Sequence, residues 1–289
     1  MDVSVTALFP GAGEAAHQNI TKRDLKRRRV SEWRRRNPVL RIMLWVVFLG
    51  GIAGGFFMPV VFLMTLAALI TWIFLYARQS SEAADDLFNA YATARGLTWS
   101  AGLRDPSLHD LPLLQRGDKR AFHRVAMGAM IDTSGSVSHY TYTEISTDSE
   151  GNRTETDYHF TLVHLPLPPD VASRYPGVYV RKKGLVSSKM FDRLTHDRKV
   201  ELESAEFRKR YSLRVVDQQD DVALYELMST SFIQHLADAA SVDGQLVQFE
   251  QRSTSLMVYV KSHLDSSADM DALVAAALPI YRRYREEYQ

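Results

Sequence analysis

The chain has 289 residues, of which 46% are hydrophobic and 24% charged, and its formal net charge at pH 7 is +1. This length allows one substantial domain with additional segments, and the charge balance excludes a uniformly basic nucleic-acid-binding protein. The chain contains no cysteine, which excludes a thiolate nucleophile and a cysteine-ligated zinc site. It is also compatible with a reducing compartment.

The first predicted unit, residues 1–38, is a disordered and then basic segment. Gly11 and Gly13 lie in a stretch of residues 1–20 with few bulky side chains, which favours disorder. The segment then becomes strongly basic, and Asp24 and Glu32 are its only acids after residue 20. The basic residues that precede the apolar run are Lys22, Arg23, Lys26, Arg27, Arg28, Arg29, Arg34, Arg35 and Arg36, followed by Arg41 at its edge.

The second predicted unit, residues 39–78, is a transmembrane helical hairpin. From Ile42 to Ala77 the sequence holds 36 consecutive residues without a charged side chain. One straight helix of that length would measure about 54 Å, whereas the hydrocarbon core is about 30 Å thick. Pro59 lies near the centre and disfavours helix continuation. We therefore predict spans over residues 40–57 and 60–77, with a re-entrant hairpin as the alternative.

The basic segment predicts the orientation of this hairpin. An excess of lysine and arginine before the first span favours the cytoplasmic side, and two spans return the chain to that side. Both termini are therefore expected in the cytoplasm. Arg34, Arg35, Arg36 and Arg41 are the expected contacts with the lipid bilayer, through anionic headgroups.

Glycine spacing in the first span predicts close helix packing. Gly50, Gly51, Gly54 and Gly55 form two overlapping G-x-x-x-G patterns, which let another helix approach closely. The second span is the simplest partner, and a homo-oligomer is the alternative. From Ile42 to Ala77 neither span contains a charged residue, whereas a transporter would normally carry one, so the hairpin is interpreted as an anchor.

The third predicted unit, residues 79–289, is a cytoplasmic α+β domain. A helix is expected to begin at Ser80 and Ser81 and to end at Gly96. Strands are expected over residues 121–132, 137–147, 154–165, 177–183, 200–203 and 211–216, with a closing hairpin at 246–250 and 255–261. Further helices are expected over residues 188–195, 223–240 and from about 267 to the end. This order predicts an antiparallel sheet with flanking helices.

One concentration of polar side chains is a candidate catalytic site. If the turn at residues 149–152 is symmetric, Tyr142 faces His159 and Glu144 faces Asp157 across two strands. Glu144, Asp157 and His159 are thus weak catalytic candidates, although an exposed polar sheet face explains them better. The sequence holds no nucleotide-binding, zinc-protease or serine-hydrolase motif, so no cofactor and no metal is predicted.

The segment from Leu202 to Tyr211 contains the motif Glu203-Ser204-Ala205-Glu206-Phe207, and it resembles a bacterial family of unknown function. That family has the pattern E-S-x-E-F-N-x-x-F and an N-terminal membrane hairpin before a cytoplasmic domain. The resemblance covers roughly residues 98–261, and Arg208 stands where the family has asparagine. It implies a shared fold and topology and no known activity. A helical turn with Phe207 and Tyr211 on one face explains the motif structurally.

These features predict a multi-pass protein of the bacterial inner membrane. Its cytoplasmic domain is expected to bind a protein partner or a lipid surface, and no nucleic acid. One alternative is a membrane-bound enzyme with a site on the Tyr142/Glu144/Asp157/His159 hairpin. The other is a self-associating membrane scaffold.

Overall fold

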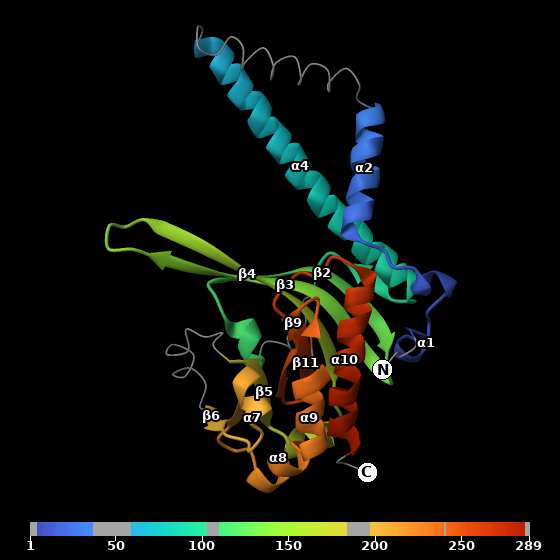
Figure 1. Cartoon of the computed structure of the whole chain (residues 1–289), viewed down its shortest axis with the longest axis vertical. Coiled ribbons are helices and arrows are strands. Elements are labelled where there is room, and N and C mark those ends of the chain that lie inside the picture. Colours follow the sequence, from blue (N-terminus) through green and yellow to red (C-terminus); the bar gives the residue numbers. More distant parts are fainter. Residues whose placement is uncertain (1–4, 37–58, 103–109, 184–196, 240, 287–289) are drawn as a thin grey trace.

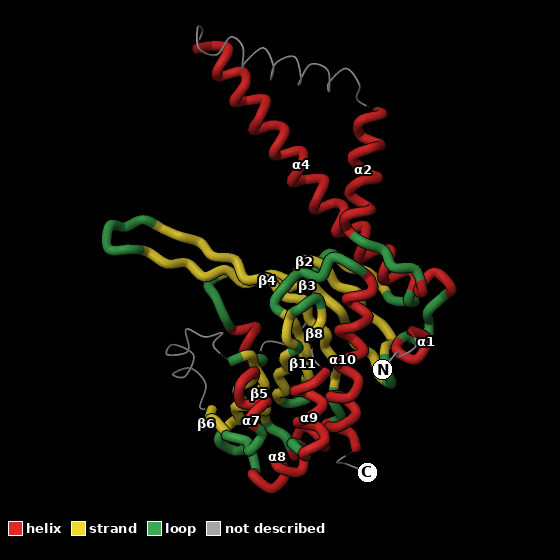
Figure 2. Tube along the Cα trace, in the orientation of Figure 1, coloured by secondary structure: helices red, strands yellow, loops and turns green. Residues whose placement is uncertain are grey.

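The computed structural model describes residues 5–36, 59–102, 110–183, 197–239 and 241–286. It confirms the α+β class, with a large antiparallel sheet and flanking helices (Figures 1 and 2). The helices are α1 (Val5–Leu8), η1 (Glu14–His17), α2 (Lys22–Arg36), α4 (Pro59–Ala94), η3 (Pro112–Gln115), α5 (Pro169–Arg174), α7 (Ala205–Arg210), α8 (Asp221–Leu227), α9 (Thr230–Ala239) and α10 (Ser267–Glu286).

The described strands form one nine-stranded antiparallel sheet and one small hairpin. The sheet order is β1-β2-β3-β4-β11-β10-β5-β7-β6, so the hairpin formed last in the sequence lies in its centre. The strands of the sheet are β1 (Thr98–Ser100), β2 (Lys119–Met130), β3 (Thr133–Thr147), β4 (Arg153–Pro166), β5 (Gly177–Lys182), β6 (Asp197–Val200), β7 (Tyr211–Val216), β10 (Gln248–Arg252) and β11 (Ser255–Val260). The small hairpin pairs β8 (Ser241–Val242) with β9 (Gln245–Leu246).

Alternation along the strands gives the sheet two different buried faces. On one face, Val137 of β3 and Val163 of β4 join the main core beneath α4 and α10. On the other face, Tyr140 and Phe160 join a smaller, largely aromatic cluster, and η3 contributes Leu113 and its neighbours to it. We refer to these as the helix face and the η3 face.

The N-terminal segment is ordered from Val5 onward, so the prediction of disorder over residues 1–20 is wrong for its described part. Leu8 and Phe9 are almost fully buried, and the ring of Phe9 lies 6.1 Å from that of Tyr91 in an edge-on contact. Two bulky residues among small ones suffice because they enter a core that α4 and the sheet have already formed.

The helix predicted to begin at Ser80 is instead the second half of α4, which runs without a break from Pro59 to Ala94. Its acidic residues form ion pairs with α2 and β2 rather than complementing a helix N-terminus. The predicted stop is confirmed, because Gly96 follows the helix with φ of +68°. In the described part of the chain, no helix combines the length and the apolar side chains that a membrane crossing requires.

The helix predicted over residues 223–240 is two helices, α8 and α9. The break lies at Met228, which leaves the helical conformation with ψ of 48°. Its side chain is buried, so an apolar residue enters the core at the break. Asp220 caps α8 by accepting a hydrogen bond from the Ala223 amide at 2.8 Å. The other predicted strands and α10 are confirmed within a few residues, and the helix predicted at residues 188–195 lies outside the described residues.

Candidate functional site

The most distinctive feature outside the sheet is a stalk formed by α2 and the first half of α4, which leave the domain on the same side (Figure 1). Arg29 of α2 donates hydrogen bonds to Glu82 at 2.6 Å and to Asp86 at 2.7 Å, both on α4. The hydrogen bond to Asp86 is the main reason that the pKa of Arg29 is raised. The base of the stalk is therefore held by a bidentate ion pair.

The two halves of α4 differ in what surrounds them. Beyond Ser81, the side chains of Leu87, Phe88 and Tyr91 are buried in the domain core. Before it, large apolar side chains are exposed, and they are seven of the ten exposed large hydrophobics in the described residues. These seven are Leu63, Leu66, Leu69, Ile70, Trp72, Ile73 and Phe74, with exposed fractions from 39% to 67%. An exposed apolar surface of this kind marks an interaction site.

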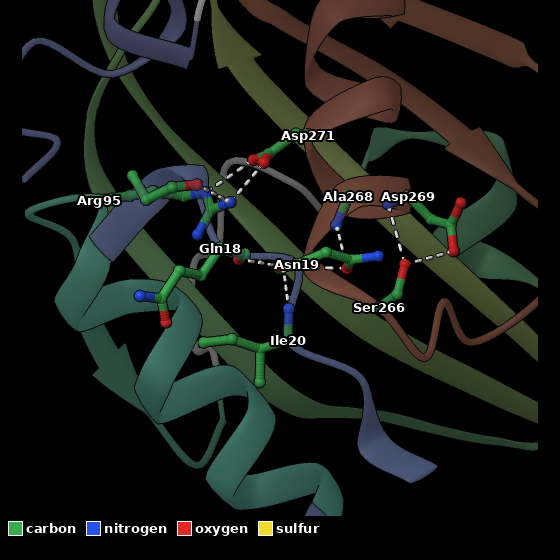
Figure 3. A network of polar contacts seen from close by, with 10 residues as sticks. Gln18, Asn19, Ile20, Arg95, Ser266, Ala268, Asp269 and Asp271 are labelled. Carbon is green, nitrogen blue, oxygen red and sulfur yellow. Dashed lines mark hydrogen bonds and ion pairs between the residues drawn. The ribbon is translucent and has the colours of Figure 1, made fainter. Parts of the chain in front are cut away.

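A polar network joins the stalk to the domain (Figure 3). The guanidinium of Arg95, just after α4, donates to Asp271 of α10 at 2.6 Å and to the carbonyl of Ala16 at 3.3 Å. The amide of Ile20 donates to the hydroxyl of Ser267 at 2.8 Å, and the amide of Ser267 donates to the Ile20 carbonyl at 2.9 Å. Both stalk helices are thus attached to α10, which fixes the direction of the stalk relative to the sheet.

The four residues of the predicted catalytic hairpin do not form one site. The strands β3 and β4 are confirmed, but their register differs by one residue: Tyr142 pairs with Tyr158, and Thr143 pairs with Asp157. The predicted pairing is wrong because Gly151 adopts φ of +86° in a turn that the Asp148 amide closes onto the Asn152 carbonyl. Because successive side chains of a strand alternate between the two faces of the sheet, this one-residue difference means that residues predicted to share a face lie on opposite faces.

As a result, Tyr142 and Glu144 lie on the η3 face, whereas Asp157 and His159 lie on the helix face. On the η3 face, burial and then the charge of Glu144 raise the pKa of Tyr158. On the helix face, Thr143 donates to Asp157 at 2.7 Å. The sheet thus separates Tyr142 and Glu144 from Asp157 and His159, and the two cavities described below are lined by other residues.

The register does bring four histidines together on the helix face, from β2, β3, β4 and the segment after β11. His263 lies at the centre, and its ring stacks on that of His139 at 4.2 Å with an interplanar angle of 2°. The rings of His159 and His123 lie 4.7 Å and 6.1 Å from it. Phe88 of α4 contacts His139 edge-on at 4.5 Å, so the cluster lies directly under the base of the stalk.

Burial favours the neutral form of three of these four histidines, His263, His139 and His123. Burial is the largest cause, and it lowers the pKa of His263 to about 4 although the bond to the Tyr140 carbonyl raises it; the charges of His159, His123 and Arg124 lower it further. The pKa values of His139 and His123 are also lowered, and burial is again the largest cause. Among the residues that the structure describes, no group of three or more histidines and acids is arranged to hold a metal ion.

These shifts predict that acid destabilises the fold. The unfolded chain takes up protons at histidine near pH 6.5, whereas folded His263 resists protonation until about pH 4. Stability is therefore full above about pH 6.5 and is lost as the pH falls toward 4, by at most about 1.4 kcal/mol per pH unit for each such histidine. Urea unfolding of the full chain in mild detergent at several pH values measures this slope.

The matched variants for this measurement are His263→Gln and His17→Gln. Because His17 is exposed, its replacement should leave the slope unchanged, whereas replacement of His263 should flatten it. Equal slopes for both variants and the parent chain would show that the cluster does not control the acid response.

The Glu203–Phe207 motif has the predicted structural role. Ser204 caps α7 by accepting a hydrogen bond from the Phe207 amide at 3.3 Å, and the rings of Phe207 and Tyr211 lie 5.3 Å apart. Both aromatic residues line a cavity of about 420 Å³ together with Arg208. Three lysines also line it, Lys183, Lys199 and Lys209.

A second cavity, of about 720 Å³, lies between α9, α10 and α1. Phe232 and Leu236 of α9 line one side of it, and Ala275, Ala276 and Pro279 of α10 line the other. It is a mainly apolar groove with His235, Arg282 and Arg283 among its polar residues.

The sequence analysis missed a buried ion pair on the η3 face. Glu250 of β10 is fully buried and accepts hydrogen bonds from Arg181 at 2.7 Å, from Tyr259 at 3.1 Å and from the amide of Leu113 at 2.8 Å. Glu250 lies in the strand sequence Gln-Phe-Glu-Gln-Arg, which is mostly polar, so the local sequence does not distinguish it from a surface acid. It attaches η3 to the sheet, and its role is structural.

The remaining predicted positions belong to the predicted membrane anchor. Arg34, Arg35 and Arg36 form the last turn of α2, whereas Arg41, Gly50, Gly51, Gly54 and Gly55 lie outside the described residues. No family model, no curated protein and no solved structure matches the chain. The resemblance to the bacterial family therefore stays a prediction.

Proposed function

We propose that the chain is an integral protein of the bacterial inner membrane that presents its α+β domain in the cytoplasm to bind a partner protein. A membrane hairpin over residues 40–77 would attach it, with both ends of the chain on the same side. The observation that carries this proposal is α4, which changes from exposed apolar side chains to buried ones at the point where it reaches the domain.

The lengths are consistent with this attachment. The exposed apolar side chains from Leu63 to Phe74 occupy about 18 Å of helix axis, less than a hydrocarbon core of about 30 Å. The proposed span, Val60–Ala77, extends this stretch at both ends over uncharged residues to about 27 Å. The basic residues of α2 then flank the membrane on the side that the positive-inside tendency favours.

The geometry supports a binding role over catalysis. The polar residues predicted as a catalytic group lie on opposite sheet faces. The stalk is bonded to α10 and continues into the sheet-covering helix, so it holds the domain at a fixed angle to its attachment. A rigidly held domain with two surface cavities is suited to display a surface to a partner.

Membrane attachment through α4 predicts a specific effect of charge. Ile70→Lys places an ammonium group near the centre of the proposed span, at a cost of about 2.5–3.5 kcal/mol for insertion. We expect a large part of the variant to leave the membrane pellet after an alkaline wash, as measured by immunoblotting. The matched control is Val222→Lys on α8, since Val222 is exposed to a similar extent, 66% against 58% for Ile70, but lies off the stalk.

Topology is tested with single cysteines, because the chain has none. A cysteine at Asp170 should react with an impermeant maleimide only after the cells are opened. A cysteine at Met58, beside the proposed turn, should react in intact spheroplasts if the hairpin crosses, and in neither preparation if it is re-entrant. A wild-type chain that alkaline washing releases, or an Asp170 cysteine labelled from outside, would contradict the proposal.

A further inference from the structure

The hairpin of β3 and β4 extends beyond the sheet as a free two-stranded ribbon, residues 144–157 (Figure 1). It is strongly acidic, because five of its residues are acids and one, Arg153, is basic. All five acids, Glu144, Asp148, Glu150, Glu155 and Asp157, are exposed. A long exposed hairpin costs conformational entropy and contributes nothing to the core, which points to a role in contact with another molecule.

Some of these charges are already used within the chain. Asp148 accepts hydrogen bonds from the turn, including the Asn152 amide at 2.8 Å, and those bonds lower its pKa. Glu155 pairs with Lys119 at 2.8 Å. Glu144 and Glu150 form no ion pair within the described residues, so the outer part of the ribbon keeps an unbalanced negative surface.

The complementary surface is the outer side of α2. Its inner side faces α4 through Arg29, but Arg23, Arg27 and Arg28 are exposed. Their guanidinium groups form no ion pair with any residue that the structure describes. The acidic residues Asp24 and Glu32 only partly balance them, so α2 presents a basic stripe.

Lipid headgroups are too far away to neutralise the domain end of this stripe. Asp86, the partner of Arg29, lies nine residues beyond Ala77, which is about 14 Å of helix. Arg23 lies six residues closer to the domain than Arg29, about 9 Å further. It is therefore separated from the proposed membrane surface by more than the Debye length of about 8 Å at physiological ionic strength.

The ribbon cannot neutralise the stripe of its own chain. It leaves the body sideways, on the side opposite to α2, at the level where α2 begins (Figure 1). In a membrane, all copies would share one orientation and one height, so the ribbon of one copy would meet the domain end of α2 on a neighbour. Confinement to two dimensions raises the effective concentration for such a contact.

We propose that the acidic ribbon of one copy docks on the basic stripe of α2 of a second copy, which gives a head-to-tail self-association. The proposal rests on the membrane attachment argued above, because that attachment aligns the copies. The contact is heterologous, so it can build rings or open rows rather than only dimers. Being formed between exposed charges, it is weakened by salt.

The experiment is disulfide crosslinking between two differently tagged full-length copies in native membranes. One copy carries Glu150→Cys and the other carries Arg23→Cys, in a chain that otherwise lacks cysteine. Mild oxidation should give a product that contains both tags. The matched control replaces Arg23→Cys with Asp170→Cys, an exposed position on α5 away from α2, and should give only a background product.

Charge exchange separates docking from misfolding. Glu144→Lys with Asp157→Lys on the ribbon copy should lower the crosslink about tenfold. Arg27→Glu with Arg28→Glu on the other copy should restore it, which a misfolded ribbon would not allow. A Glu150–Arg23 product no stronger than the Asp170 control, or one unaffected by the charge reversals, would overturn the self-association.

The same samples distinguish the two proposals. If the chains remain in the alkaline-washed membrane and no mixed product forms, the head-to-tail contact is wrong and the membrane attachment stands. If the chains are found in the wash, the attachment is wrong, and with it the alignment on which the contact depends.

Discussion

Replacing Glu250 by alanine is expected to destabilise the folded chain by about 3–5 kcal/mol, among the largest effects of any single substitution in this protein. Its carboxylate is completely buried on the η3 face and is the counter-ion of Arg181, whose side chain is 9% exposed. Burial alone would lower the pKa of Arg181, yet the charge of Glu250 raises it overall. Without Glu250, a buried guanidinium keeps its charge and loses the group that stabilises it.

Two further bonds would be lost in the same variant. Burial and the charge of Glu250 raise the pKa of Tyr259, whose hydroxyl donates to that carboxylate. The amide of Leu113 would lose its acceptor, so η3 should detach from the sheet and expose the aromatic cluster beneath it. Hydrogen exchange at residues 111–115 should therefore rise more than exchange elsewhere.

The controls separate charge from packing. Glu250→Gln removes the charge and keeps one acceptor oxygen, for either Tyr259 or the Leu113 amide but not both, so it should recover only part of the loss. The double variant Arg181→Met with Glu250→Leu removes both charges and should be markedly more stable than Glu250→Ala, since a buried pair replaced by apolar groups is often neutral. Urea unfolding of the full chain in detergent measures each value, and a double variant as unstable as the single one would contradict the interpretation.

The strands and the α+β class could be predicted because they depend on local patterns. The segments that became β3 and β4 are long, rich in β-branched and aromatic residues, and separated by turn residues. The proline-rich segment after residue 165 and the closing hairpin before Lys261 gave equally clear ends. Such signals are contained within a dozen residues.

The candidate site could not be predicted in the same way because it depended on register. A one-residue difference in the pairing of β3 and β4 moves Asp157 and His159 to the face opposite Tyr142. The conformation of Gly151 sets that difference, and glycine tolerates several turn types. The histidine cluster that the true register creates contains residues from four separate segments, so no local spacing in the sequence predicts it.

The continuity of α4 shows a different limit. By local rules a helix should begin at Ser80 and Ser81, because three acidic residues follow them, Glu82, Asp85 and Asp86. Here the acids serve other partners, because Arg29 pairs with Glu82 and Asp86 while Arg124 pairs with Asp85 at 2.6 Å. These acidic residues therefore form long-range ion pairs, whereas the local sequence predicts that they stabilise a helix N-terminus. The result is a single helix that joins the exposed apolar surface to the core.

Replacing Arg95 by alanine is expected to cost about 3–5 kcal/mol and to release the N-terminal segment from the domain. The Arg95 side chain is 1% exposed, and it bonds to both oxygens of Asp271 and to the carbonyl of Ala16. Its guanidinium also lies 4.1 Å from the centre of the Tyr91 ring, a cation–π contact in a desolvated site. Its loss leaves Asp271 and the Ala16 carbonyl without these bonds, in the place where the stalk joins α10 (Figure 3).

The local consequence distinguishes this variant from a general loss of stability. Hydrogen exchange of the Ile20 and Ser267 amides, which bond the N-terminal segment to α10, should increase well before the sheet opens. Arg95→Lys keeps a charge but not the two parallel bonds to Asp271, so it should recover less than half of the loss. The matched control is Arg285→Ala, whose pair with Asp132 is exposed at 3.9 Å and should be worth less than about 1 kcal/mol. Equal effects of Arg95→Ala and Arg285→Ala would show that the junction does not hold the stalk to the domain.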